Sequence, residues 1–153
     1  MNEHDEHFMR IAIAAAIEAR TNGEVPIGAC LADASGNMIA SGANLTITNT
    51  DPTAHAEIVV LREAAKVVGN YRLTGTTMYS TIEPCAMCAG AIVNARIERL
   101  VFGAHDIRFG AVESVFELCT SPHLNHRIEI SSGVLAEECR PLVQDFFKEK
   151  RKG

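Results

Sequence analysis

The residues best suited to chemistry are a histidine, a glutamate and two cysteines at the starts of two apolar segments. His55 and Glu57 occur in "DPTAHAEIVVLREAA", and Cys85 and Cys88 occur in "YSTIEPCAMCAGAIV". Histidine nitrogens and cysteine thiolates are ligands that zinc prefers in proteins. These residues raise two questions: whether they form a metal site, and whether that site leaves room for a substrate.

The spacing of the two cysteines predicts a metal site. Residues three apart lie on one face of a helix, and Pro84 marks the start of this helix. Unpaired backbone N–H groups and the helix dipole favour thiolates in the first turn, and the thiolate is the form that binds metal. We expect His55 in the first turn of an earlier helix, so that one imidazole and two thiolates converge where the two N-termini face each other.

Three protein ligands of this kind are typical of catalytic zinc, because the fourth tetrahedral position stays open for water. Glu57 is the predicted catalytic residue, since a carboxylate beside the open position can take a proton from water and hand it to a leaving amine. His55 and Glu57 do not share a face on an ideal helix. The long Glu57 side chain must therefore bend around the helix end.

Two other interpretations of the cysteine pair stay open. Such a pair can be a redox couple, and a closed structural zinc site would need a fourth ligand. Cys30, Cys119 and Cys139 are isolated, and we interpret each as a small core hydrophobe. A redox couple does not explain the His-Ala-Glu motif, and a closed zinc site does not need a carboxylate that is not a ligand.

The elements that must position these residues alternate between helix and strand. Helical periodicity predicts a helix over residues 8–19, and "VPIGACLAD" and "MIASGAN" predict a β-hairpin. Asp51 and Pro52 are interpreted as the N-cap and first residue of the next helix. Strands are expected at "TTMYSTI", "ERLVFGA" and "HRIEI", with a short helix at "CAMCAGAIVNA".

The last segment predicts a helix that is kinked or broken at Pro141, because proline cannot donate the helical hydrogen bond. Phe146 lies on the apolar stripe of that helix, whereas Phe147 lies off it. The order of elements predicts an α/β fold, a three-layer α/β/α sandwich with a mixed central sheet.

The composition is that of a soluble globular protein. Of its 153 residues, 47% are hydrophobic and 22% are charged, which suits one domain over residues 1–153. No apolar run is long enough to span a membrane, and the acidic start lacks the basic character of a targeting signal. We therefore expect a cytoplasmic protein whose five cysteines stay reduced.

The charge balance alone does not favour a nucleic-acid partner. The net charge is −5, whereas a basic footprint usually marks proteins that bind nucleic acid. The tail "FFKEKRKG" holds four of the fourteen basic residues. Taken alone, a solvated helix end explains this tail, because cations are placed favourably against the helix dipole there.

Several segments together resemble one family. The pattern "NxxxxxxDPTAHAEI" with "NYRL", "EPCAMCAGAI", "ARIERLVFGAHD", "NHRIEI" and "GVLAEEC...FF" resembles bacterial tRNA-specific adenosine deaminases of the TadA type. The resemblance runs from about Glu24 to Arg151, and the segments from "ARIERLVFGAHD" onward are the more specific ones. It implies a cytidine deaminase-like fold and a hydrolytic conversion of adenosine to inosine at the wobble position of tRNA.

The resemblance also implies roles for particular residues. His55, Cys85 and Cys88 would hold one zinc ion per subunit of a homodimer, and Glu57 would shuttle protons. Asn44 would hydrogen-bond the flipped adenine, Ala56 would read its edge through the backbone, and Ile27 and Ile82 would wall the pocket. The implied contacts to the tRNA anticodon stem-loop are Asp106, Phe146, Phe147 and Arg151, with Arg108, Asn125 and His126 as weaker candidates. Phe146 could instead be a core residue, which makes Phe147 the better stacking aromatic.

Three features depart from the tRNA deaminase pattern. "NLTITNTDP" is neutral and similar to the same stretch in bacterial guanine deaminases of this superfamily. Phe109 and Glu113 occupy a loop where the tRNA enzymes usually carry small residues, and Pro141 interrupts the helix that would present the tail to RNA. A free-nucleobase deaminase acting on guanine or a related base therefore stays open as an alternative.

Overall fold

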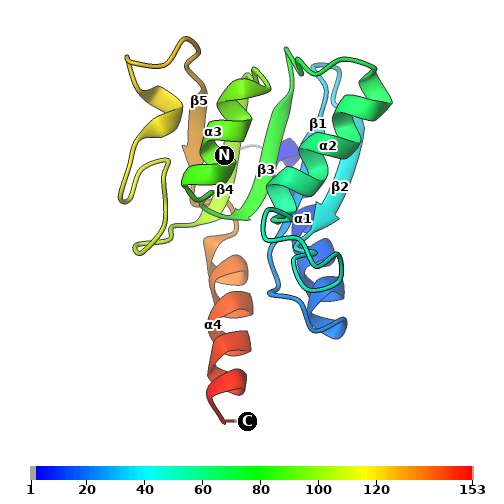
Figure 1. Ribbon diagram of the computed structural model, residues 1–153, viewed down its shortest axis with the longest axis vertical. Helices are drawn as coiled ribbons and strands as arrows, with labels where there is room; N and C mark the ends of the chain where they lie inside the picture. The colour runs from blue at the N-terminus through cyan, green and yellow to red at the C-terminus, as the bar shows by residue number, and fades with distance from the viewer. Residues whose placement is uncertain (1–2, 153) are drawn as a thin grey trace.

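The computed structural model of the protein describes residues 3–152 and is built around a five-stranded mixed sheet (Figure 1). The strands are β1 (Gly28–Ala32), β2 (Met38–Ala43), β3 (Thr77–Ile82), β4 (Arg99–Ala104) and β5 (Glu129–Ser132), in the order β2-β1-β3-β4-β5. β1 pairs antiparallel with β2 and β3, whereas β3 with β4 and β4 with β5 are parallel.

Helices cover both faces of this sheet. α2 (Ala56–Val68) and α3 (Ala86–Asn94) pack on one face, and α1 (Glu3–Thr21) and α4 (Ala136–Lys152) pack on the other. Because successive strand residues point to opposite faces, Ala29 and Leu31 of β1 join the first core cluster, and Cys30 and Ala32 join the second. The predicted three-layer α/β/α sandwich is confirmed.

The start of α2 differs from the prediction. The helix begins at Ala56 with His55 as its N-cap, so the proposed cap at Asp51 is wrong. The Asp51 carboxylate instead accepts hydrogen bonds from the Thr53 N–H at 2.8 Å and the Thr53 hydroxyl at 2.7 Å. An aspartate followed by proline serves a turn as well as a helix start, and here the local turn is formed.

The expected break at Pro141 is also wrong, because α4 runs without interruption from Ala136 to Lys152. Pro141 is exposed, whereas Cys139 and Phe146 face the protein interior. Packing of this buried side against the sheet holds the helix in one piece although one backbone hydrogen bond is missing. Strand β5 begins at Glu129 rather than at His126. Among residues 3–152, no helix has both the length and the apolar character needed to cross a membrane.

Candidate active site

The candidate site lies where α2 and α3 begin, at the carboxyl ends of the parallel strands β3 and β4. His55 is the N-cap of α2 and Cys85 is the N-cap of α3, both with extended backbone, and Cys88 lies in the first turn of α3. His55 is thus one residue outside the helix in which it was predicted. On an ideal helix, His55 and Glu57 would point to different faces. The backbone of His55 is not helical, so this restriction does not apply here.

The three predicted metal ligands converge. The Nδ1 atom of His55 lies 3.5 Å from the Sγ atoms of both Cys85 and Cys88, and one ligand atom from each residue lies within 4.8 Å of the others. Zinc–sulfur bonds of about 2.3 Å and zinc–nitrogen bonds of about 2.0 Å in a tetrahedron place sulfur and nitrogen about 3.5 Å apart. The donor set and its spacing therefore fit a zinc ion.

The two thiols differ in their readiness to ionise. The hydrogen bond that Cys88 donates to Cys85, with further help from His55, lowers the pKa of Cys85 to about 5. The same hydrogen bond, together with burial, raises the pKa of Cys88. One thiolate is thus available at neutral pH, and a cation that binds there would displace the proton of the second thiol.

Glu57 is buried beside these ligands, with 4% of its surface exposed. Burial raises the pKa of Glu57 to about 7, and the negative charge of Cys85 adds to this effect, although hydrogen bonds oppose it. A carboxyl group with a pKa near neutrality can both accept and donate a proton under ordinary conditions. The position and the pKa of Glu57 suit a proton carrier.

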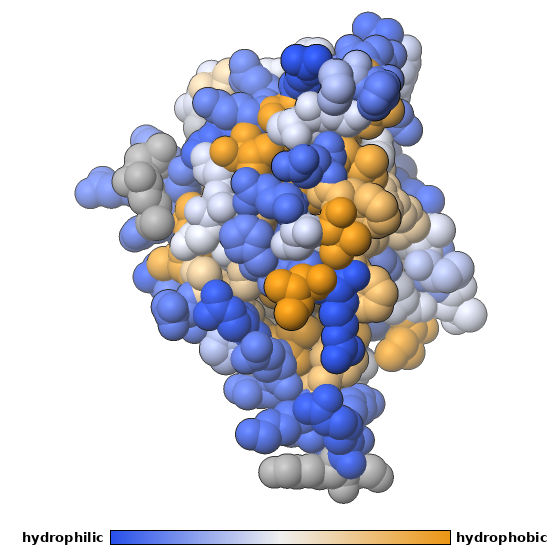
Figure 2. All heavy atoms as spheres, turned by 90° about the vertical axis from the view of Figure 1, so that its left-hand side faces the viewer, coloured by the Kyte–Doolittle hydropathy of each residue, from blue (hydrophilic) through white to orange (hydrophobic). Residues whose placement is uncertain are grey.

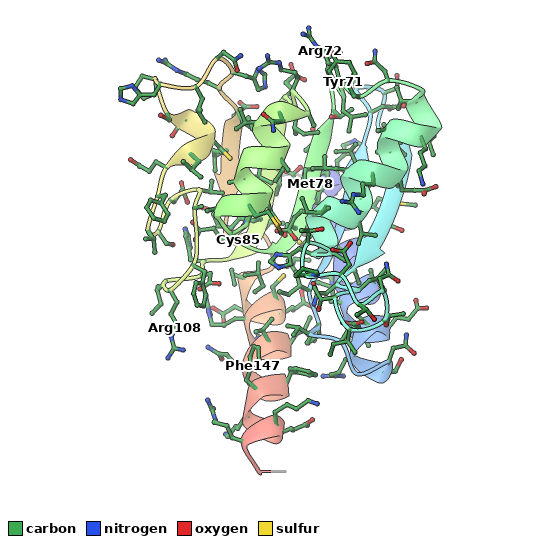
Figure 3. All side chains as sticks on the ribbon, viewed as in Figure 1. Tyr71, Arg72, Met78, Cys85, Arg108 and Phe147 are labelled. Carbon is green, nitrogen blue, oxygen red and sulfur yellow. The ribbon has the colours of Figure 1, made fainter. Side chains whose placement is uncertain are left out.

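His55, Glu57 and Cys85 line a cavity of about 1190 Å³, and Cys88 is fully buried next to them. The cavity wall is formed partly by the segment after β4 and partly by α4. Figure 3 shows Cys85 where α3 begins, with Arg108 and Phe147 toward the same end of the molecule and Tyr71 and Arg72 at the opposite end. The cavity brings together most of the predicted contacts, namely Ile27, Asn44, Ala56, Ile82, Asp106, Arg108, Phe147 and Arg151.

Asn44 directly follows β2, and its side chain is buried in the wall of the cavity. The Nδ2 atom of Asn44 donates a hydrogen bond to the Thr46 hydroxyl at 3.3 Å. The position of its backbone is fixed because its N–H donates to the Ile27 carbonyl at 3.1 Å. Asn44 therefore presents an amide to the cavity from a fixed position.

The two phenylalanines of α4 have different surroundings. Phe146 is buried and is not one of the described residues that line the cavity. Phe147 is 45% exposed and lines the cavity. Their rings meet edge to face, with centroids 5.4 Å apart, and Lys150 Nζ lies over the Phe146 ring. Of these two rings, Phe147 is thus the one available for stacking.

Two weaker candidates lie elsewhere. Asn125 accepts a hydrogen bond of 2.8 Å from Arg96, and the Nε2 atom of His126 lies 2.8 Å from the Ile97 carbonyl oxygen. Neither is among the residues that line the cavity within residues 3–152. Both side chains have partners in the segment that connects α3 to β4.

Sequence reasoning missed two buried carboxylates. Glu24 accepts hydrogen bonds from Ile47 and Thr48, and Glu83 accepts them from the segment after β4. Burial opposes ionisation of each, but these hydrogen bonds outweigh it and lower the pKa of both groups. The sequence did contain one indication that Glu83 is important: it is a charged residue between a strand and Pro84, in a segment that is otherwise buried.

The rim of the cavity is basic although the chain as a whole is acidic. Five cationic side chains line the cavity, and four of them come from α4; the five are Arg108, Arg140, Lys148, Lys150 and Arg151. The acidic residues at the same rim are Asp106 and Asp145. A net charge of −5 therefore conceals a local basic surface at the mouth of the site.

A histidine and two cysteines at two helix starts, with a buried carboxyl group beside them, suit zinc-dependent hydrolytic chemistry. Residues 2–104 match the family model of the cytidine and deoxycytidylate deaminase zinc-binding region. The tRNA-specific adenosine deaminase of Haemophilus influenzae is 51% identical, over 98% of this chain and 87% of its own length. That of Bacillus subtilis is 47% identical, over 97% and 91%. The chain belongs to the tRNA-specific adenosine deaminase family.

Solved structures agree with this assignment. One, from a study of A-to-I editing by tRNA:A34 deaminases, is 44% identical, with a TM-score of 0.86 over 89% of this chain and 98% of its own. A guanine deaminase from Bacillus subtilis is 33% identical, with a TM-score of 0.65 over 100% and 96%. The cytidine deaminase-like fold and the resemblance drawn from the sequence are both confirmed.

Proposed function

We propose that this protein deaminates adenosine to inosine at the wobble position of tRNA, with zinc held by His55, Cys85 and Cys88. The observation that carries the proposal is the cavity, because its lining brings His55, Cys85 and Glu57 together with the basic side chains of α4. Family membership supports the same activity, since the relatives are named tRNA-specific adenosine deaminases.

The reaction adds water at the carbon that bears the exocyclic amine, breaks the carbon–nitrogen bond and releases ammonia. A zinc ion in this site would supply Lewis-acid activation of the water. Glu57 takes a proton from the water and passes it to the ring nitrogen beside that carbon. Glu57 then carries the proton of the added hydroxyl to the departing amino nitrogen, so that the base gains a carbonyl oxygen and a ring N–H, ammonia leaves, and no redox step is needed. Asn44 hydrogen-bonds the edge of the base, and Ile27 and Ile82 hold the base by apolar contact.

The rim of the cavity suits RNA. A base can reach the bottom of the site only after it has left the stack. Arg108, Lys148 and Arg151 are placed to contact phosphates around it, and Phe147 offers an exposed ring on which a neighbouring base can stack. Asp106 lies at the same rim and contributes a hydrogen-bond acceptor. Phe146 acts indirectly, by supporting Phe147.

We also propose that the protein is a homodimer with one zinc ion per subunit and that it works in the cytoplasm, where tRNA serves translation. Outside the cavity lining, large apolar side chains are exposed on the segment between β4 and β5; they are Val115, Phe116 and Leu124. Figure 2 shows hydrophobic surface among hydrophilic residues on this side of the molecule. Burying such a patch against a second subunit would be favourable. The single domain expected over residues 1–153 is consistent with two core clusters that share one sheet.

The proposed activity is tested by inosine formation on an anticodon stem-loop with adenosine at the wobble position, using zinc-loaded protein. A stem-loop with guanosine at that position is the control. We expect conversion confined to the wobble adenosine. The absence of conversion by zinc-loaded protein, with ammonia release from free guanine, would instead establish the free-base activity that the guanine deaminase similarity leaves open.

A further inference from the structure

The deamination chemistry does not use Glu83, yet this residue is the most extensively hydrogen-bonded carboxylate beside the site. Its side chain is 3% exposed and lies between β3 and the first cysteine ligand. Oε1 accepts hydrogen bonds from the Asp106 N–H at 3.1 Å and the Ser114 hydroxyl at 2.5 Å. Oε2 accepts from the N–H groups of Val112, Glu113 and Ser114 at 2.8–3.1 Å.

All five donors belong to one loop, residues 105–114, which also forms a wall of the cavity. The lining residues of this loop are His105, Asp106, Ile107, Arg108 and Phe109. Glu83 holds the loop at both ends, at Asp106 and at residues 112–114. Between these ends the Asp106 carboxylate accepts the N–H groups of Arg108 and Phe109 at 3.0 and 3.1 Å. The two ends of this loop are therefore held by one buried carboxylate, and the turn between them is held by Asp106.

The backbone around Glu83 is matched to the same loop. Its N–H donates to the Ala104 carbonyl, and the carbonyl of Pro84 accepts the Ala111 N–H, both at 2.9 Å. A Cβ atom at Gly110 would lie 2.4 Å from the Glu83 carboxylate and 2.5 Å from the Asp106 carbonyl oxygen. Only glycine lets the loop approach this closely. The Glu83 segment and the 105–114 loop are thus each shaped to pack against the other.

We propose that Glu83 is a positioning residue that fixes the 105–114 loop and so sets where Arg108 and Phe109 meet the substrate. The chain from Glu83 through Pro84 to Cys85 connects this wall directly to a predicted metal ligand. A carboxylate serves here because it is acceptor-only, so all five donors find a partner. An amide in its place would turn an N–H₂ group toward backbone N–H groups. The effect of Glu83 on substrate binding rests on the proposed function, whereas its effect on the loop does not.

The test compares Glu83→Gln with the unmodified zinc-loaded protein. Amide hydrogen exchange of residues 106–114 reports on the loop without any substrate, and stem-loop deamination gives KM and kcat separately. We expect loss of at least about tenfold in the protection of these amides, because the charge-assisted hydrogen bonds to Oε2 are lost. KM should rise about tenfold, with kcat changed by less than about threefold, since binding contacts are displaced while the metal ligands and Glu57 stay in place.

Asp5→Asn is the matched control, because Asp5 is an equally buried carboxylate that contacts Arg99 and Tyr79 instead of the cavity. It should lower stability but leave the loop protection and KM unchanged. Ser114→Ala removes one donor while keeping the carboxylate, and it should show a smaller effect in the same direction.

Unchanged protection and KM in Glu83→Gln and Ser114→Ala would overturn the proposal. Loss of zinc by Glu83→Gln would also overturn it, and would assign Glu83 to support of the metal site. If Glu83→Gln fails to fold, the decision rests on Ser114→Ala. If the unmodified protein proves inactive on tRNA, the proposed function fails, while the exchange measurement still decides whether Glu83 positions the loop.

Discussion

At the scale of single residues, the site separates the groups that can hold a metal from the group that can move a proton. His55, Cys85 and Cys88 direct their ligand atoms toward one another. Glu57 is buried beside them, and burial raises its pKa to about 7. Metal retention and proton transfer therefore depend on different side chains and can be tested one at a time.

Glu57→Gln should abolish most of the deaminase activity while keeping the metal. Glutamine fills the same space but cannot carry the proton from water to the leaving amine, so we expect roughly a thousandfold loss of rate. Single-turnover inosine formation measures the rate, and elemental analysis measures bound zinc. Glu63→Gln, an exposed position of the same helix, is the control. A Glu57→Gln rate within tenfold of the unmodified protein would show that another group carries the proton.

Asp5 supports the fold on the opposite face of the sheet. Its carboxylate accepts hydrogen bonds of 2.8 and 2.7 Å from Arg99 and one of 3.0 Å from the Tyr79 hydroxyl. Burial alone would raise the pKa of Asp5, but these bonds and the charge of Arg99 lower it below 3.8. A lowered folded-state pKa means that Asp5 stabilises the protein above the unfolded pKa, and that this stability is lost as pH falls through the folded value.

Asp5→Asn should therefore lower the free energy of unfolding at pH 7 by about 3 kcal/mol, because Arg99 loses its buried partner. The difference from the unmodified protein should shrink as the pH falls below about 3.8, where Asp5 of the unfolded chain is already protonated. Urea unfolding at several pH values measures both effects. Glu137→Gln, at an exposed carboxylate, serves for comparison. A difference that stays constant down to the lowest pH would contradict this role of the Asp5 charge.

At the scale of elements, the sequence predicted what depends on local patterns. The central strands β1, β3 and β4 could be located because each is a short, largely buried run, and α3 because its cysteines and Pro84 mark a helix start. The start of α2 was misplaced because Asp51 and Pro52 fit a turn as well as a cap. The continuity of α4 through Pro141 depends on packing against the sheet, which no local pattern contains.

The same limit applies to the candidate site. The metal ligands were found because their types and spacing are specific on their own. Glu83 was missed because its role depends on donors from residues 106–114, far along the chain. The basic rim was missed as a unit because Arg108 is distant in sequence from the tail of α4, and the two meet only at the cavity.

Helix α4 gives the cavity most of its positive charge, and this element should govern RNA affinity. Replacing Lys148 and Arg151 together by alanine should weaken stem-loop binding and lower the slope of log affinity against log salt by about 1.5. Fluorescence anisotropy at several salt concentrations measures both quantities. The matched control is the pair Arg20→Ala and Lys66→Ala, which removes two exposed charges away from the cavity. Equal changes in the two double variants would show that total charge, and not α4, determines binding.

At the scale of the whole molecule, the metal site joins parts of the chain that are distant in sequence. His55 precedes α2, which packs against β1 and β2, whereas Cys85 and Cys88 belong to the connection from β3 into α3. An ion bound by all three residues would connect two halves of the sheet. Because such a preformed site exists only in the folded chain, binding of the ion stabilises the fold.

Removing zinc should therefore lower the temperature of unfolding. Zinc at a hundredfold excess over its Kd contributes about 2.7 kcal/mol to the free energy of unfolding, and a chelator removes this contribution. Differential scanning calorimetry of zinc-loaded protein with and without chelator gives the shift. Cys85→Ser is the control, since a protein that has lost a ligand should unfold at nearly the same temperature in both conditions. An equal shift in the variant would mean that the chelator acts elsewhere, and that the three ligands do not join the two halves of the sheet.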